Sequence, residues 1–186
     1  MTQWIGGLGI VFFTIAVLPI FGVGSVQLFA AEATGPTHDK VHPRIGVTAK
    51  WIWTIYLGLT ITEIILLVAG GMNFFDSVCH SLTTTATGGY STKQNSIAAF
   101  NSPYIEYIIT LFMFLAGINF TLLYLLFLKG NFKRLLQNTE LHWYLGTVGF
   151  FTLFTTATLI FTSPFSIEES FRKAIFQVVS LQTTTG

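Results

Sequence analysis

The sequence contains few charged residues. Asp, Glu, Lys and Arg make up only 9% of its 186 residues, whereas 52% are hydrophobic. Soluble domains carry about a quarter charged residues. A chain with so little charge cannot cover a water-exposed surface, so the composition excludes an ordinary soluble domain. The net charge of +1 also gives no reason to expect nucleic acid as a partner.

Cysteine is nearly absent, and the N-terminus lacks basic residues. The single Cys79 excludes an intramolecular disulfide framework. No basic segment precedes the first apolar run, which argues against a cleavable signal peptide. The chain opens directly into an apolar block and stops on Thr185-Gly186 after another one. We therefore expect both ends to be cut from a longer protein.

The apolar residues fall into blocks of two lengths. A membrane-spanning helix needs roughly 20 residues, and four blocks are long enough: 4–29, 51–70, 104–128 and 143–162. Two further apolar segments, 72–85 and 167–182, are too short to cross. We therefore expect an all-α integral membrane protein with about four spanning helices and two short helices that enter the membrane and turn back.

The basic residues predict the orientation. They gather in two loops, 30–50 and 129–142, whereas residues 71–103 contain only Lys93. Basic loops of membrane proteins stay in the cytoplasm. The pattern predicts a multi-pass protein of the plasma (inner) membrane, with these two loops cytoplasmic and both short helices returning to the outer side.

A pattern occurs twice along the chain. Residues 51–88 and 143–186 each contain a long apolar block, a break with Gly or Pro, a short helix and a threonine-rich run that ends in glycine. The final glycines, Gly88 and Gly186, are 98 residues apart (186 − 88). This spacing predicts that a whole helix–pore-helix–helix unit is repeated.

The chemistry of the threonine-rich runs favours a cation site. A short helix that enters from outside directs its carbonyl end, with about half a negative charge, toward the membrane centre. Backbone carbonyls after it can replace the hydration shell of an ion. We expect the β-branched threonines to keep an extended backbone and the glycines to adopt dihedral angles that other residues avoid.

Several separated stretches resemble, in order, the Trk/Ktr-type potassium uptake transporters. They include Thr2–Ile10, Phe75–Thr92 and Phe171–Gly186. The membrane pore subunits of this family contain four helix–pore-helix–helix repeats with re-entrant filter loops, as in potassium channels. The resemblance implies K⁺ transport through a backbone-carbonyl selectivity filter, no enzymatic activity, and no cofactor in this chain besides the K⁺ that is transported. It also implies the lipid bilayer, the missing repeats of a full-length subunit, a second copy in a homodimer and a cytosolic nucleotide-binding regulatory subunit as partners.

The resemblance assigns each part of the chain to a repeat. Residues 51–128 match a complete second repeat with its filter at 86–89, and residues 143–186 match a third repeat that stops at its filter. Residues 1–29 match the second helix of a preceding first repeat, and residues 30–50 and 129–142 match cytoplasmic loops. The fold is therefore expected to be incomplete, and this chain alone should not form a whole pore.

Carried over by position, the filter residues fall into two groups that would bind K⁺ through their backbone carbonyls. One group would line one quarter of the filter: Ala86, Thr87, Gly88 and Gly89. The other would line a second quarter: Thr184, Thr185 and Gly186. Asn119, the lone amide in the third long block, either faces the permeation path below the filter or bonds a neighbouring helix.

Other polar residues support weaker alternatives. We favour a buried structural hydrogen bond for Glu63 over a proton relay or an ion ligand. A catalytic or metal site at Cys79 and His80 lacks an orienting group, and Asp76 more simply complements the dipole of its helix. The alternatives to a potassium pathway are a broken-helix secondary transporter for another solute, a membrane enzyme, and an inactive fragment.

Overall fold

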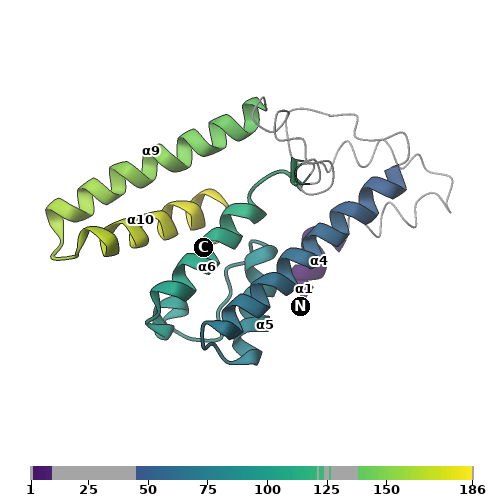
Figure 1. The fold of residues 1–186 in the computed structure, drawn as a ribbon, viewed down its shortest axis with the longest axis horizontal. Coiled ribbons are helices and arrows are strands. Elements are labelled where there is room, and N and C mark those ends of the chain that lie inside the picture. The colour runs from purple at the N-terminus through teal and green to yellow at the C-terminus, as the bar shows by residue number, and fades with distance from the viewer. Residues whose placement is uncertain (1, 10–44, 121, 124–125, 127–137, 186) are drawn as a thin grey trace.

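The computed structural model describes residues 2–9, 45–120, 122–123, 126 and 138–185. These residues are mostly helical, and no strand occurs among them. Two long helices are each followed by a short one, α4 (Ile45–Ala69) by α5 (Phe74–Thr85) and α9 (Thr139–Thr162) by α10 (Ile167–Gln182). Figure 1 shows α9 and α10 as a helical hairpin, with α4 and α5 forming a second hairpin across the molecule.

The long helices have the length and composition of membrane spans. Among the described residues, two stretches are long and apolar enough to cross a bilayer, Trp51–Ala69 and Thr139–Thr162. Helix α9 leaves most of its large apolar side chains uncovered, and Phe161 is 89% exposed. A surface of this kind suits lipid or another apolar segment and not water. Two of the four predicted spanning helices are thus present with the expected length.

Each hairpin is closed by a short link with a local cause. Between α4 and α5, Gly71 adopts a φ of +88°, which glycine permits without steric cost. Between α9 and α10, Pro164 follows the end of α9, and the Ser166 side chain accepts a hydrogen bond from the Glu169 N–H at 3.2 Å. Serine is a preferred N-cap residue. Both short helices therefore begin close to where the sequence predicts.

Helix α6 (Pro103–Ala116) joins the two hairpins. It packs against α4, α5 and α10. An apolar cluster around it includes Leu67 of α4, Met113 of α6 and Val179 of α10. The 3-10 helix η3 (Ser96–Phe100) leads into α6. Burial of such side chains stabilises each by about 1.5–3 kcal/mol relative to exposure. This cluster holds α10 against α6 and the end of α4.

The third long block differs from its prediction. We expected one helix over residues 104–128, but α6 ends at Ala116 and helical structure resumes only after Asn119. The Asn119 carbonyl accepts hydrogen bonds from the N–H groups of Leu122 and Leu123, which starts a new turn. Gly117, a poor helix former, lies in the break against the end of α10. A local helix breaker, Gly117, and the close approach of Thr183 of α10 thus coincide at this interruption.

Most of the first predicted block lies outside the described residues, as do residues 30–44 and 129–137 of the two basic loops. Residues 45–50, predicted as loop, belong to α4, and residues 139–142 belong to α9, so both long helices begin earlier than expected. At the N-terminus the structure describes a short α1 (Thr2–Trp4) and a π-helical turn η1 (Ile5–Gly9). The Trp4 ring stacks on Tyr56 of α4, with ring centroids 5.3 Å apart. The N-terminal segment is therefore attached to the first hairpin.

Candidate functional site

The chain turns sharply where α5 ends, at the first predicted filter. Ala86 has φ −85° and ψ 2°, and Thr87 adopts a left-handed φ of 50°. The Thr87 N–H donates to the Thr84 carbonyl at 3.0 Å, and the Gly88 N–H donates to the Thr83 carbonyl at 2.7 Å. These two bonds form a Schellman motif, which satisfies carbonyls that the end of a helix would otherwise leave unpaired.

The end of α10 repeats this turn. Thr183 has φ −87° and ψ 1°, and Thr184 adopts a left-handed φ of 56°. The Thr184 N–H donates to the Leu181 carbonyl at 3.2 Å, and the Thr185 N–H donates to the Ser180 carbonyl at 2.9 Å. Two helices far apart in the sequence thus end in one backbone conformation, in which Thr87 corresponds to Thr184.

The threonines at these turns do not keep the extended backbone that we expected. Thr87 and Thr184 occupy the left-handed position that glycine usually takes in this motif. A β-branched residue there is a genuine outlier, and the left-handed conformation costs L-residues about 1–2 kcal/mol. Such strain persists only where the surrounding structure imposes it, and it clusters at ligand-binding and switch regions. The expected glycine conformation occurs at Gly89, whose φ is 66°.

Gly88 lies against the end of the Gln3 side chain. A Cβ atom at this position would meet the side-chain amide of Gln3. Gln3 is exposed and belongs to α1, so its side chain has room to move aside. No local sequence pattern indicates this contact, because Gln3 and Gly88 are far apart along the chain.

Buried hydroxyl groups support the first turn from behind. The Thr85 hydroxyl lies 2.8 Å from the Ser81 carbonyl, 3.4 Å from Oε2 of Glu63 and 3.3 Å from the Thr60 hydroxyl. The Trp4 Nε1–H donates to Thr60 at 3.0 Å. The Glu63 carboxyl is fully buried, and its Oε2 lies near this hydroxyl, whereas its Oε1 has no hydrogen-bond partner among the described residues. The structural role that we favoured for Glu63 stays a prediction.

The second turn has a different support. The Thr183 and Thr185 hydroxyls are 2.8 Å apart, and both residues are buried. Gly117, in the break after α6, lies directly against the methyl group of Thr183. Asn119 follows two residues later, so the break brings it near this end of α10. Gly186 lies outside the described residues.

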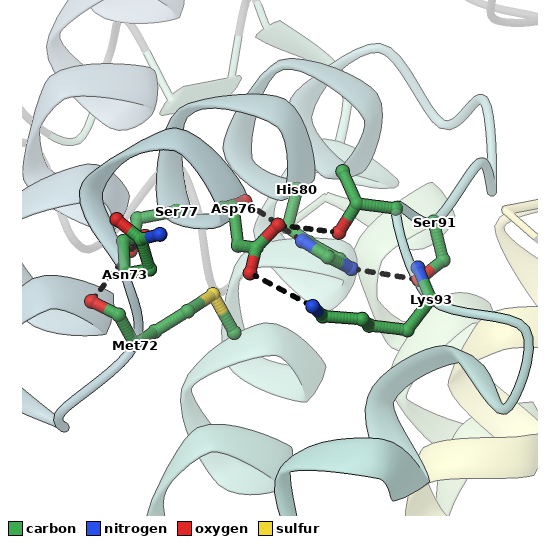
Figure 2. Close-up of polar contacts among 8 residues, drawn as sticks. Met72, Asn73, Asp76, Ser77, His80, Ser91 and Lys93 are labelled. Atoms are coloured by element: carbon green, nitrogen blue, oxygen red, sulfur yellow. Dashed lines mark hydrogen bonds and ion pairs between the residues drawn. The ribbon is translucent and has the colours of Figure 1, made fainter.

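The segment after the first turn runs back along α5 (Figure 2). The Thr92 hydroxyl donates to Oδ1 of Asp76 at 2.7 Å, and Nζ of Lys93 lies 3.7 Å from Oδ2. The Thr92 hydrogen bond lowers the pKa of the Asp76 carboxyl, and the charge of Lys93 acts in the same direction. In the same segment, Nε2 of His80 lies 3.0 Å from the Ser91 hydroxyl.

These contacts argue against a catalytic site at Cys79 and His80. Nδ1 of His80 lies 2.7 Å from the Asp76 backbone carbonyl, so both ring nitrogens have partners other than Cys79. Among the described residues, no group of three His, Cys, Asp or Glu side chains is placed to hold a metal ion. The polar side chains in this region form hydrogen bonds and an ion pair with other residues of the same chain.

The two turns share the chemistry of a cation site. Each follows the C-terminal end of a short helix, which carries about half a negative charge. The residues at the turns, Ala86–Gly89 and Thr183–Thr185, offer backbone carbonyls and hydroxyls and contain no carboxylate. Such groups can coordinate a monovalent cation without binding it too tightly to release it.

Comparison with known proteins decides the family. The sequence profile of TrkH, described as a cation transport protein, matches residues 1–186. The chain belongs to the TrkH family. The Trk system potassium uptake protein TrkH of Escherichia coli K12 is 41% identical over 190 residues, which cover 100% of this chain and 39% of that protein. TrkI of Halomonas elongata, another Trk system potassium uptake protein, is 35% identical over 99% of this chain and 37% of that protein.

A solved TrkH structure has the same fold. The crystal structure of the potassium transporter TrkH from Vibrio parahaemolyticus matches with a TM-score of 0.78 and 33% sequence identity. The match covers 99% of this chain and 37% of the V. parahaemolyticus TrkH chain. The predicted resemblance and the helical membrane-transporter fold are confirmed, and the relatives are transporters, not enzymes. The chain spans 39% of the length of the E. coli TrkH protein.

Three residues that contact the first turn and the segment after it have no role that the sequence predicts. Gln3, Ser91 and Thr92 lie within the stretches that resemble the family, but no local pattern indicates what they contact. The one available signal was the run Ser91-Thr92-Lys93 directly after Gly88-Gly89-Tyr90. Hydroxyl and ammonium groups at that place can reach back to the start of the preceding helix.

Proposed function

We propose that this chain forms part of the K⁺ pathway of a Trk-type potassium uptake subunit. In this proposal the backbone carbonyls of residues 86–89 line one quarter of a selectivity filter, and those of residues 184–186 line another. The observation that carries the proposal is the recurrence of one strained turn, with Thr87 and Thr184 left-handed at the ends of two short helices.

The need to remove water from the K⁺ ion supports this proposal. A K⁺ ion that enters a narrow path must lose water, and ordered carbonyl oxygens can replace that hydration shell. Non-helical backbone is tolerated at membrane depth only where protein buries it or where it lines a water-filled cavity. The Schellman bonds consume carbonyls of the last helical turn, at Thr83 and Thr84 for α5. The carbonyls that follow remain for an ion.

The finer features of the proposal come from the family. We include Asn119 as a side chain of the pathway below the filter, in the break after α6. We place the protein in the plasma membrane with loops 30–50 and 129–142 in the cytoplasm. A complete pore requires the remaining repeats of a full-length subunit, and we expect that subunit to form a homodimer with a cytosolic nucleotide-binding regulator.

The test is K⁺ uptake by a full-length subunit that contains this sequence, expressed in a bacterium without its own uptake systems. The decisive variant is Gly88→Ser, because it places a side chain inside the proposed filter segment, against the end of the Gln3 side chain. The matched control is Gly58→Ser on α4, where an added Cβ meets nothing within 4 Å. Membrane abundance of each variant is measured in parallel.

We expect Gly88→Ser to raise the KM for K⁺ or to weaken discrimination against Na⁺, with abundance close to that of the parent. Gly58→Ser should behave as the parent does. Unchanged transport by Gly88→Ser would show that Gly88 is only a turn glycine. In that case the filter assignment fails, and a broken-helix transporter for another solute becomes the better reading.

A further inference from the structure

The segment that follows the first turn lies along one face of α5. Contacts occur at Asp76, His80 and Thr83, which are four and three residues apart and therefore share a helix face. Their partners come in the reverse order along the returning chain. Thr83 meets the Tyr90 carbonyl at 3.0 Å, His80 meets Ser91, and Asp76 meets Thr92. The helix and the returning segment thus run antiparallel in a fixed register.

The His80 contact has a defined direction. A backbone carbonyl can only accept, so Nδ1 of His80 carries the hydrogen that is donated to the Asp76 carbonyl at 2.7 Å. In the neutral ring, Nε2 then accepts from the Ser91 hydroxyl at 3.0 Å. The Ser91 oxygen in turn accepts from the Lys93 N–H at 3.1 Å. The ring is further held by edge contact with Phe100, whose centroid is 5.5 Å away.

The contact of Asp76 with Thr92 lies at the end of this register that is farthest from the turn. Asp76 is 7% exposed, and its carboxylate accepts a short hydrogen bond from Thr92 while Lys93 lies beside it. A hydrogen bond to an ionised acceptor is roughly twice as strong as one between neutral groups. Asp76 also lies in the first turn of α5, where a negative charge is favourable. Figure 2 shows Asp76 and His80 pointing from the helix toward Ser91 and Lys93.

We propose that these six residues, the return clamp, are positioning residues for the filter turn: Asp76, His80, Thr83, Tyr90, Ser91 and Thr92. The clamp holds both ends of the segment 84–89, so it sets where the backbone carbonyls of that segment lie. This inference rests on the proposed function, because it assigns the segment 84–89 to the ion path. Its consequence is that cation discrimination depends on contacts made by side chains that do not touch the ion.

Discrimination would depend on the clamp because the carbonyl oxygens of an ion site must be held in precise positions. Functional groups must be held within about 0.5 Å of their working positions by surrounding contacts. Between the end of α5 at Thr85 and Tyr90 the chain is neither helix nor strand, apart from the turn at residues 86–87. Release of the clamp would let the outer part of this segment move, and ions of different size would then be accommodated more equally.

The test compares Thr92→Val with Thr92→Ser in the full-length subunit. Valine has nearly the shape of threonine but cannot donate to Asp76, whereas serine keeps the donor. Gln94→Ala, a change at a neighbouring exposed residue outside the clamp, is the matched control. Ser91→Ala, which removes the donor to His80, is a second variant at the same segment. The measurements are the KM for K⁺, the inhibition constant of Na⁺, the maximal rate and the membrane abundance.

We expect Thr92→Val to reduce the ratio of the Na⁺ inhibition constant to the K⁺ KM on the order of tenfold, with little change in abundance. Ser91→Ala should shift the ratio in the same direction, and Thr92→Ser and Gln94→Ala should retain it. A fall in abundance with an unchanged ratio for both Thr92→Val and Ser91→Ala would overturn the inference, because the clamp would then be merely structural.

Gly88→Ser, measured in the same assay, distinguishes a failure of the clamp inference from a failure of the filter assignment. If it alters discrimination while Thr92→Val and Ser91→Ala do not, the clamp inference is wrong and the filter assignment stands. If Gly88→Ser also leaves discrimination unchanged, the filter assignment fails and the clamp inference fails with it.

Discussion

The hydroxyl of Thr85 lies 3.4 Å from Oε2 of Glu63, which joins the last turn of α5 to the membrane span α4. Glu63 is fully buried, and Thr60, one turn earlier on the same face of α4, contacts the same hydroxyl. A buried carboxyl group is costly unless it is hydrogen-bonded. The turn at the end of α5 is therefore contacted from behind by this hydroxyl, and loss of the hydroxyl leaves Oε2 of Glu63 buried without that partner.

The first prediction removes this hydroxyl. We expect Thr85→Val to destabilise the full-length subunit by about 1–3 kcal/mol, the cost of leaving a buried polar group without its hydrogen bond. Thr85→Ser keeps the hydroxyl and should cost less. The melting temperature in detergent measures both. The double variant Thr85→Val/Glu63→Leu should recover part of the loss, because it removes the stranded carboxyl. Additive losses would contradict a contact between the two residues.

The second prediction concerns the break after α6. A Cβ at Gly117 would lie 2.6 Å from Cγ2 of Thr183 and 2.7 Å from the Tyr144 hydroxyl. Gly117→Ala should therefore destabilise the protein by about 1–3 kcal/mol through overpacking. Gly146→Ala on α9, where nothing lies within 4 Å, should instead stabilise it by about 0.5–1 kcal/mol. Equal melting temperatures for the two variants would show that α10 does not lie against Gly117.

The third prediction concerns the ion pair between α6 and α10. Nε of Arg172 lies 3.0 Å from Oε2 of Glu106, and their side chains are only 10% and 20% exposed. Glu106→Gln should destabilise the fold by about 2–3 kcal/mol, because the largely buried Arg172 charge then keeps only the more distant Glu168 carboxylate, 3.8 Å away. The matched control is Glu169→Gln at the exposed pair with Lys173, where the loss should stay below about 1 kcal/mol. Equal effects in a thermal unfolding assay would refute the structural role of the buried pair.

The fourth prediction is a pH dependence. The Thr92 hydrogen bond lowers the pKa of Asp76 from its ordinary value of 3.8. Because the folded pKa is below the unfolded one, the contribution of Asp76 to stability is fully present above pH 3.8 and is lost as the pH falls through the lower folded value. The difference in melting temperature between the parent and Asp76→Asn should be constant near neutral pH and should shrink in acid. A difference that grows on acidification would contradict this sign.

The helices of the chain were largely predictable because their causes are local. The block 167–182 was predicted with the observed bounds, and 72–85 was observed as Phe74–Thr85. The lengths of apolar runs and the breaks at Gly70-Gly71 and Pro164 fix these elements through backbone geometry alone. The same information placed the two threonine-rich runs at the ends of short helices.

The details of the site were not predictable because they depend on residues far apart in the sequence. Gly89 takes the unusual dihedral angles that we expected of glycine, but Thr87 and Thr184 take them too, since a Schellman turn requires the left-handed conformation at that position whatever residue occupies it. The close approach of Thr183 to Gly117 also joins residues far apart in the sequence. The roles of Gln3 and Thr92 follow from contacts with Gly88 and Asp76.

Local sequence is enough to establish a helical membrane protein with a repeated pattern of long helix, short helix and threonine-rich run, because hydrophobic block length and chain breaks are properties of neighbouring residues. Three features emerge only in the folded chain: the two runs end in one strained turn, α6 ends against α10, and Asp76 and His80 bind the returning segment. Those features arise from packing and hydrogen bonding between distant segments, whose energies no local pattern records.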